Sequence, residues 1–148
     1  MFTLDSFFPS QPKVERRIYP HFELPVVPRP NVLMVNLKRL AFALKGDDTF
    51  WATGIADRHE GQNFISGKYD YAVGKIREGK PLVMPWLMFE YGRTSITDGR
   101  HRLYALIDEG FTHCPVVVDD AFLPMIITLV DETDRPEPES QSGRLSAN

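Results

Sequence analysis

The sequence predicts an α+β domain in which a small sheet is flanked by helices. The 148 residues suit one domain, and a hydrophobic share of 43% is enough to build a core. Two compact apolar runs, residues 31–37 and 114–118, are typical of buried strands. Between them, apolar residues recur at helical spacing, which indicates helices beside the strands.

The two ends of the chain differ from the domain between them. Residues 1–30 are rich in proline and aromatic side chains, so we expect an extended arm over the domain, with room for a short strand. Residues 131–148 are polar and acidic, and we expect a disordered tail. The domain itself is then expected to span residues 31–130.

Within the first half of that domain, the pattern predicts a strand, a helix, a loop and a second helix. The strand at residues 31–37 is followed by helical spacing over 37–44. Residues 51–67 contain three glycines and no sustained period, which predicts a long loop, and such loops are often functional. Residues 68–80 form a short amphipathic pattern that Gly79 ends.

The second half begins with a predicted hairpin. Residues 81–92 are strand-like but broken by Pro85, which indicates an edge strand or a bulge. Residues 93–97 are rich in β-branched side chains and predict the second arm of a hairpin that turns at Tyr91 and Gly92.

A helix and a buried strand are expected after the hairpin. Thr97 or Asp98 is the natural N-cap of the helix, and Gly110 is its natural end. Residues 114–118 then predict the strand, whereas residues 124–130 fit either another strand or a short helix.

The start of that helix has an unusual charge pattern. Gly99 permits a positive φ or the close approach of a ligand to the backbone. The N–H groups of a first helical turn lack intrahelical partners and carry partial positive charge, which cationic side chains oppose. Arg100, His101 and Arg102 in succession are therefore explained if an anion covers the turn, and we predict a phosphate site there.

Other interpretations of these residues stay open. The arginines could belong to a solvated helix face or pair with Glu90 or Asp108. Glu90 is also a candidate general base, while Arg93 and Thr97 are candidate phosphate contacts on the strand or ordinary hairpin residues. Asp98 could cap the helix or hold Mg²⁺ that neutralises the phosphates.

A second candidate site lies in the predicted loop, at Asp57, Arg58, His59 and Glu60. The spacing is too compact for a recognised metal pattern, and a zinc site there would need a further ligand such as His101. The same loop could also be a lid that contacts substrate.

The stretch ITDGRHRLYALIDEGFTHCPVVV, residues 96–118, resembles the ParB/sulfiredoxin-like superfamily. Members carry a strand, a Gly-x-His-Arg turn, a helix with small inner residues, a glycine stop and a strand that begins with Pro-Val. The matching residues are Gly99, His101, Arg102, Ala105, Gly110, Pro115 and Val116. The resemblance covers residues 80–118 well and the opening from Asn31 more loosely. It implies a small mixed sheet flanked by helices, with nucleotide phosphates bound at the turn.

The sequence differs from the superfamily pattern at some positions, and these differences exclude some of the activities that its members have. Sulfiredoxins carry a cysteine between the glycine and the histidine, where this chain has Arg100, so sulfinic-acid reduction is not implied. Cys114 is expected to be a small core residue. The chain ends too soon for the helix-turn-helix domain of chromosome-partitioning ParB proteins, so we expect a stand-alone domain. It resembles the plasmid fertility-inhibition factors, some of which are described as having ATPase and DNase activities.

Two functions from different classes follow. In the first, the protein is a phosphohydrolase that acts on a nucleotide or on DNA during conjugative transfer, with ATP or another nucleotide and Mg²⁺ as cofactors. Its phosphate ligands would come from Arg93, Thr97 and residues 99–102, and its catalytic groups from Glu90, Asp98 and His101. In the second, a non-catalytic nucleotide-binding module uses its arm and tail to contact a protein of a conjugation or secretion system. A third possibility is that the fold survives with an inactive pocket.

Charge and cysteine content limit the remaining classes. The net charge of -3 and the pI near 5.8 argue against a general basic nucleic-acid binder, although a local patch is allowed. The single cysteine permits no internal disulfide, which fits a reducing compartment. No apolar run approaches the roughly 20 residues that span a bilayer, and the N-terminus lacks the features of a secretory signal. We therefore expect a cytoplasmic protein with no membrane partner.

Overall fold

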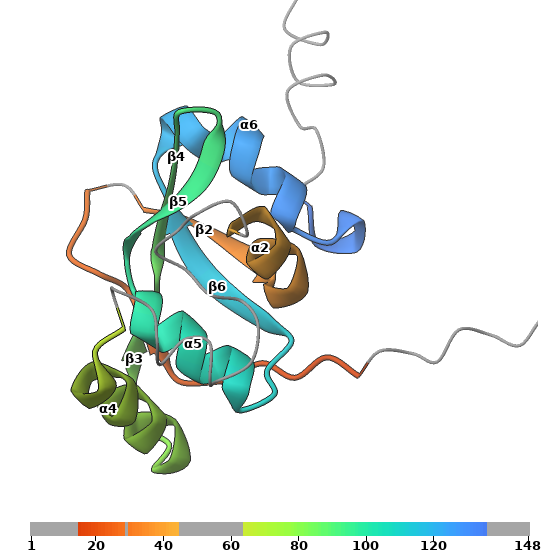
Figure 1. Ribbon diagram of the computed structural model, residues 1–148. Coiled ribbons are helices and arrows are strands. Elements are labelled where there is room, and N and C mark those ends of the chain that lie inside the picture. Colours follow the sequence, from red (N-terminus) through yellow and green to blue (C-terminus); the bar gives the residue numbers. More distant parts are fainter. Residues whose placement is uncertain (1–14, 29, 45–63, 136–148) are drawn as a thin grey trace, which may run out of the picture.

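The computed structural model describes residues 15–28, 30–44 and 64–135, which form an α+β fold around one mixed sheet (Figure 1). The sheet has the order β2-β6-β4-β5. Strand β6 runs antiparallel to β2 and parallel to β4, and β4 runs antiparallel to β5. The four strands are β2 (Asn31–Asn36), β4 (Trp86–Glu90), β5 (Arg93–Asp98) and β6 (His113–Val118). The predicted fold class, a small mixed sheet flanked by helices, is confirmed.

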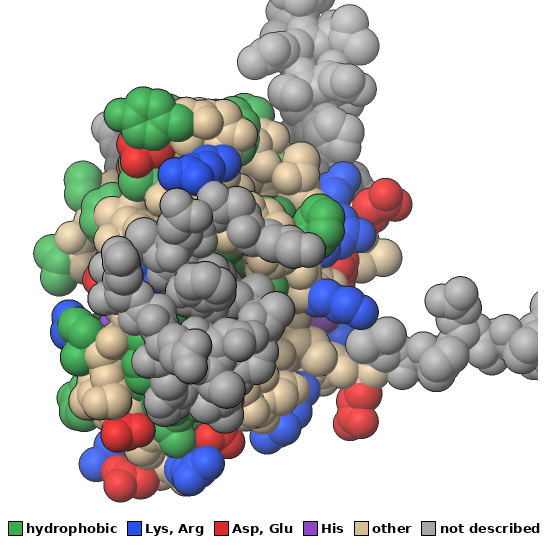
Figure 2. All heavy atoms as spheres, viewed as in Figure 1, with side chains coloured by type: hydrophobic (Ala, Val, Ile, Leu, Met, Phe, Trp, Pro, Cys, Tyr) green, Lys and Arg blue, Asp and Glu red, His purple; other side chains and the backbone are tan. Residues whose placement is uncertain are grey.

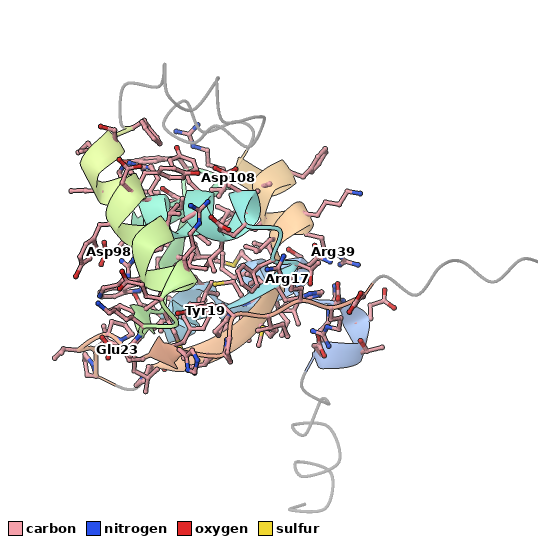
Figure 3. All side chains as sticks on the ribbon, turned by 90° about the horizontal axis from the view of Figure 1, so that it is seen from below. Arg17, Tyr19, Glu23, Arg39, Asp98 and Asp108 are labelled. Atoms are coloured by element: carbon pink, nitrogen blue, oxygen red, sulfur yellow. The ribbon has the colours of Figure 1, made fainter. Side chains whose placement is uncertain are left out.

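The helices lie close to the predicted positions. Asn36 caps the first of them, because its side chain accepts hydrogen bonds from the backbone N–H groups of Lys38 and Arg39. Figures 1 and 3 place α2 and α5 on the same face of the sheet. The main helices are α2 (Leu37–Ala43), α4 (Ser66–Arg77), α5 (Arg100–Asp108) and α6 (Leu123–Ile126).

The hairpin between β4 and β5 has the predicted turn. Tyr91 has a φ of 53° and Gly92 a φ of 74°, the pair of positive values that a two-residue type I′ turn requires. Pro85 separates β4 from the short strand β3 (Leu82–Val83), and the pairing of β4 is irregular at Trp86. The break at the proline and the bulge alternative are therefore confirmed, whereas β4 is not an edge strand, because it lies between β6 and β5.

Helix α5 and strand β6 form the centre of the core. All six residues of β6 are buried, which explains why its sequence is a continuous apolar run instead of an alternating one. Leu103, Tyr104, Ala105 and Leu106 of α5 are also fully buried. Cys114 is buried as predicted, and burial raises the pKa of its thiol, so it is not a reactive thiolate.

The described part of the N-terminal segment, residues 15–28, contacts the domain at several points. Ile18 pairs with His113, and the short strand β1 (Phe22–Glu23) pairs in parallel with β3. Tyr19 is 3% exposed, and its hydroxyl oxygen lies within hydrogen-bond distance of the carbonyl oxygens of Lys75 and Lys80, at and just after the end of α4. The arm therefore holds one end of α4 against the domain. Residues 1–14 and 29 lie outside the described part.

Of the two alternatives left open for residues 124–130, a strand or a short helix, the structure has the helix. Residues 123–129 form α6 and a 3-10 turn, and only Val130 makes a strand-like bridge, to Val35. Asp131 and Asp134, which were assigned to the tail, contact the domain through His113 and Arg16. Residues 131–135 are thus in contact with the domain, and residues 136–148 lie outside the described part. Among the described residues, no helix has the length and apolarity needed to cross a membrane.

The contact between Asp131 and His113 is a buried polar link that the sequence did not reveal. His113 is 3% exposed. Its Nε2 lies 2.7 Å from Asp131 Oδ2, and its Nδ1 lies 2.7 Å from the Thr112 hydroxyl. Asn36 also donates to Asp131. The hydrogen bond from His113, helped by Asn36, lowers the pKa of the Asp131 carboxyl.

We expect Asp131→Ala to lower the free energy of unfolding by about 1–3 kcal/mol, because it leaves a buried imidazole nitrogen unpaired. Since the carboxyl pKa is depressed in the fold, its contribution is present above the ordinary value of 3.8 and is lost as pH falls through the lower folded value. Denaturant titrations at neutral and acidic pH should therefore show the difference between variant and wild type shrinking in acid. Asp134→Ala is the control, because its pair with the exposed Arg16 is a surface ion pair of about 0–1 kcal/mol. Equal losses for both variants would contradict the prediction.

Candidate functional site

A cleft of about 540 Å³ lies at the start of α5. Its lining includes the whole predicted turn, residues 97–102, together with one face of α4 and both residues of β3. The DGRHR turn, residues 98–102, thus follows β5 and lines a cleft. A phosphate site at this turn requires such a cleft.

Gly99 makes this corner of the chain possible. Its φ is 102°, and a Cβ atom added there would lie 2.9 Å from both Cα and Cβ of Pro85. Gly99, and neither Thr97 nor Asp98, is the N-cap of α5, and it offers no side chain to the first-turn N–H groups. The first turn also contains no acidic residue. The helix therefore begins without the neutralising groups that stability alone would favour, which suits an anion.

Arg102 is bound to the protein's own groups. Its Nη1 donates to the Val83 carbonyl oxygen at 2.6 Å, and its Nη2 lies 3.1 Å from Asp98 Oδ2. The Arg102 side chain is 18% exposed, whereas that of Asp98 is 70% exposed. This pairing explains why Asp98 does not cap the helix. It also makes Arg102 a residue that ties β3 to the corner between β5 and α5.

His101 links α5 to the start of α4. Its Nε2 accepts a hydrogen bond of 2.9 Å from the backbone N–H of Ile65, the residue that precedes α4. The ring also contacts Phe64 and Tyr104, at centroid distances of 5.8 and 5.9 Å. Because Nε2 is an acceptor here, it carries no proton, and the neutral ring is protonated at Nδ1. His101 cannot donate a proton from Nε2 while this bond is made.

The structure does not bring Glu90 and Arg93 to the cleft. They face each other across the hairpin beside its turn, at the opposite end of β5 from Asp98. At about 3.3 Å per residue, the length of β5 separates Arg93 from Asp98 by roughly 17 Å. Glu90 and Arg93 are near residues 98–102 in the sequence, but they lie beside the hairpin turn, at the end of β5 that is far from the cleft. The loop residues 57–60 lie outside the described part.

Two site residues come from α4 and were not identified in the sequence. Lys68 and Lys75 line the cleft with Tyr71, and their spacing places all three on one face of the helix. In the sequence, the apolar stripe through Tyr69 and Ile76 indicates the buried face of this helix, and nothing in the pattern indicates that the lysine face lines a cleft. The lining side chains then comprise four Lys and Arg residues and, as carboxylate, Asp98.

This concentration of positive charge is local. On the face seen in Figure 2, Lys and Arg side chains are interspersed with Asp and Glu, as the net charge of -3 leads one to expect. Figure 3 shows Asp98 beside α4, on the other side of the molecule from Arg39, which pairs with Asp131. The cleft is thus separate from the Asp131 link. A small cationic cleft in an acidic protein focuses the field on one anionic ligand.

His113, Asp131 and Asp134 form the group of potential metal ligands found among the described residues. The two carboxylates already pair with His113, Asn36, Arg39 and Arg16. We therefore assign this group to stability and not to metal binding.

The arrangement of strands and helices was compared with known proteins. The fold is similar to that of a plasmid fertility inhibition factor. The solved structure of this factor, the Oncogenic Suppression Activity Protein, matches with a TM-score of 0.50 and 16% identity over 78% of the chain described here. The match covers 64% of that protein's own chain. At this identity the likeness shows the fold alone. No protein-family model matches the sequence, and no curated protein does.

Proposed function

We propose that this protein is a member of the ParB/sulfiredoxin-like superfamily that binds a nucleotide or nucleic-acid phosphate at the start of α5 and hydrolyses it. The observation that supports this most is the cationic cleft at a helix start with no capping side chain and no acidic residue. Phosphate groups bind such helix starts because N–H groups and positive charge converge there.

The residues of the cleft divide the task. Arg100, with the N–H groups of the first turn, grips the phosphate, and Thr97 lies at the rim. Arg102 orients the corner and holds Asp98. His101 fixes α4 relative to α5. Charge that develops on the phosphate during hydrolysis would be stabilised by the same groups.

Mg²⁺ fits this site in the manner usual for nucleotide enzymes, in which one or two carboxylates and the substrate's phosphates share the ion. Asp98 is the lining carboxylate among the described residues and would be the protein ligand. When bound, the ion would neutralise phosphate charge. Asp98 also remains the candidate for orienting the attacking water, since Glu90 lies at the far end of β5.

We further propose that the activity serves plasmid fertility inhibition in the cytoplasm, through a nucleotide or DNA of a conjugative element. The fold likeness to a fertility inhibition factor supports this extension.

A second function, a non-catalytic nucleotide-binding module that inhibits a protein of the transfer machinery, is favoured by one observation. Asp98, the carboxylate of the described lining, is already paired with Arg102, so the described lining offers no unpaired carboxylate as general base.

Titration of the full chain with ATP and with inorganic tripolyphosphate, with and without Mg²⁺, tests the first proposal. We expect Arg100→Ala to weaken binding of both by roughly 10- to 100-fold, the effect of about 1.4–2.7 kcal/mol for a charge-assisted contact. Arg93→Ala is the matched control, since it removes an arginine of the same region outside the cleft, and should leave affinity unchanged. Phosphate release that needs Mg²⁺ and falls in Asp98→Asn would support hydrolysis. Binding without release would favour the module, and no binding of either compound would refute both functions.

A further inference from the structure

The wall of the cleft opposite α5 is built for more than an anion. Tyr71 lines it with 66% of its surface exposed, and Ile65 beside it is 49% exposed. The lining also includes the apolar residues Ala72, Leu82, Val83 and Ile96, together with Lys68 and Lys75 of α4. A bare phosphate would gain nothing from such a wall, whereas a ligand with a flat apolar part would bury it.

Cations flank the aromatic ring on this wall. Lys75 Nζ lies 4.8 Å from the centre of the Tyr71 ring, close enough for a cation–π contact. Lys68 precedes Tyr71 by three residues and Lys75 follows it by four, so all three lie on one face of α4. An aromatic ring between cations, next to a phosphate site, is the combination by which proteins stack a base while neutralising its phosphates.

The size of the cleft agrees with such a ligand. Its volume of about 540 Å³ lies within the usual range for small-molecule sites and exceeds what a single phosphate requires. The residues of the α5 turn and those of α4 line this same cleft, so one molecule can contact both walls.

We infer that Tyr71, flanked by Lys68 and Lys75, is a stacking subsite for a nucleobase whose phosphates bind at Gly99–Arg102. The ligand is then a nucleotidyl group, and neither a bare phosphate nor a simple sugar phosphate. This inference rests on the proposed phosphate site. The base can come from a free nucleotide or from single-stranded nucleic acid, because the stacking chemistry is the same.

The test compares three probes on the full chain: tripolyphosphate, ATP and a short single-stranded DNA. We expect Tyr71→Ala to weaken ATP or the DNA by roughly 5- to 50-fold, the effect of losing one base–aromatic stack, and to leave tripolyphosphate unchanged. Tyr71→Phe should retain the affinity, because it keeps the ring. Tyr91→Ala is the control, since it removes an exposed tyrosine at the hairpin turn, away from the cleft.

The results distinguish the stacking subsite at Tyr71 from the proposed phosphate site at the start of α5. If Tyr71→Ala affects ATP and DNA no more than tripolyphosphate, the stacking subsite is refuted while the Arg100 result stands. If Arg100→Ala leaves tripolyphosphate binding intact, the phosphate site itself fails. A selective loss for ATP identifies a mononucleotide as the ligand, and a selective loss for DNA identifies a strand. Either selective loss supports the subsite.

Discussion

Gly99→Ala is expected to lower the free energy of unfolding by roughly 2–5 kcal/mol and to abolish phosphate binding in the molecules that remain folded. Two costs add. A φ of 102° is strained for any residue with a Cβ, and that atom would lie 2.9 Å from the Pro85 backbone, which cannot move aside like a flexible side chain. Relief of the clash must shift the corner that positions Arg100.

The measurement is a denaturant titration alongside a tripolyphosphate titration. Gly74→Ala is the matched control, because a Cβ there meets nothing within 4 Å. Gly74 lies inside α4, so alanine should be neutral or raise stability by about 0.5–1 kcal/mol. If the Gly99→Ala protein were as stable as the wild type, the prediction would be wrong, because the backbone around Gly99 and Pro85 could then move to accommodate a Cβ atom.

Arg102→Ala is expected to cost about 1–3 kcal/mol of stability and to weaken phosphate binding by about tenfold or more. The variant leaves the Val83 carbonyl oxygen without its charged donor and releases Asp98 beside the phosphate site. The bond to Val83 accounts for most of the stability loss, since the mostly exposed Asp98 contributes little through its ion pair.

The contrast with Arg100→Ala distinguishes the roles of the two arginines. Arg102→Ala should lower the temperature of thermal unfolding, because the Val83 carbonyl oxygen loses its charged donor, whereas the expected effect of Arg100→Ala is on phosphate binding. Adding Asp98→Asn to Arg102→Ala should recover part of the binding, because it removes the released carboxylate. If both arginine variants keep full stability and lose binding equally, Arg102 is a direct phosphate ligand and not a positioning residue.

The sequence predicted most of the fold because local rules governed those elements. The Tyr91–Gly92 turn, the break at Pro85 and the continuous apolar run of β6 each follow from backbone or burial constraints that act over a few residues. Residues 124–130 were ambiguous, because a short apolar run has no period that separates helix from strand.

The site was only partly predictable, because its remaining parts depend on contacts distant in sequence. The 98–102 turn was predicted from its charge pattern and from the superfamily resemblance, and its residues line the cleft. Arg102 donates a hydrogen bond to the carbonyl oxygen of Val83, which is 19 positions away in the sequence. His101 accepts a hydrogen bond from the backbone N–H of Ile65, which is 36 positions away. Neither contact has a sequence signal. His113 was similarly hidden, since its partner Asp131 lies in a segment whose composition indicates disorder.

The Tyr19 hydroxyl has a consequence beyond its own segment. Its single proton lies between the carbonyl oxygens of Lys75 and Lys80, and this contact holds one end of the helix that carries Tyr71 and the two lysines. A shortened protein that begins at residue 31 would keep residues 97–102 of the proposed phosphate site but would lose the contact between Tyr19 and α4. A protein cut at the boundary that composition suggests would thus lose the Tyr19 contact at one end of α4, while the bond between His101 and Ile65 would still hold the other end.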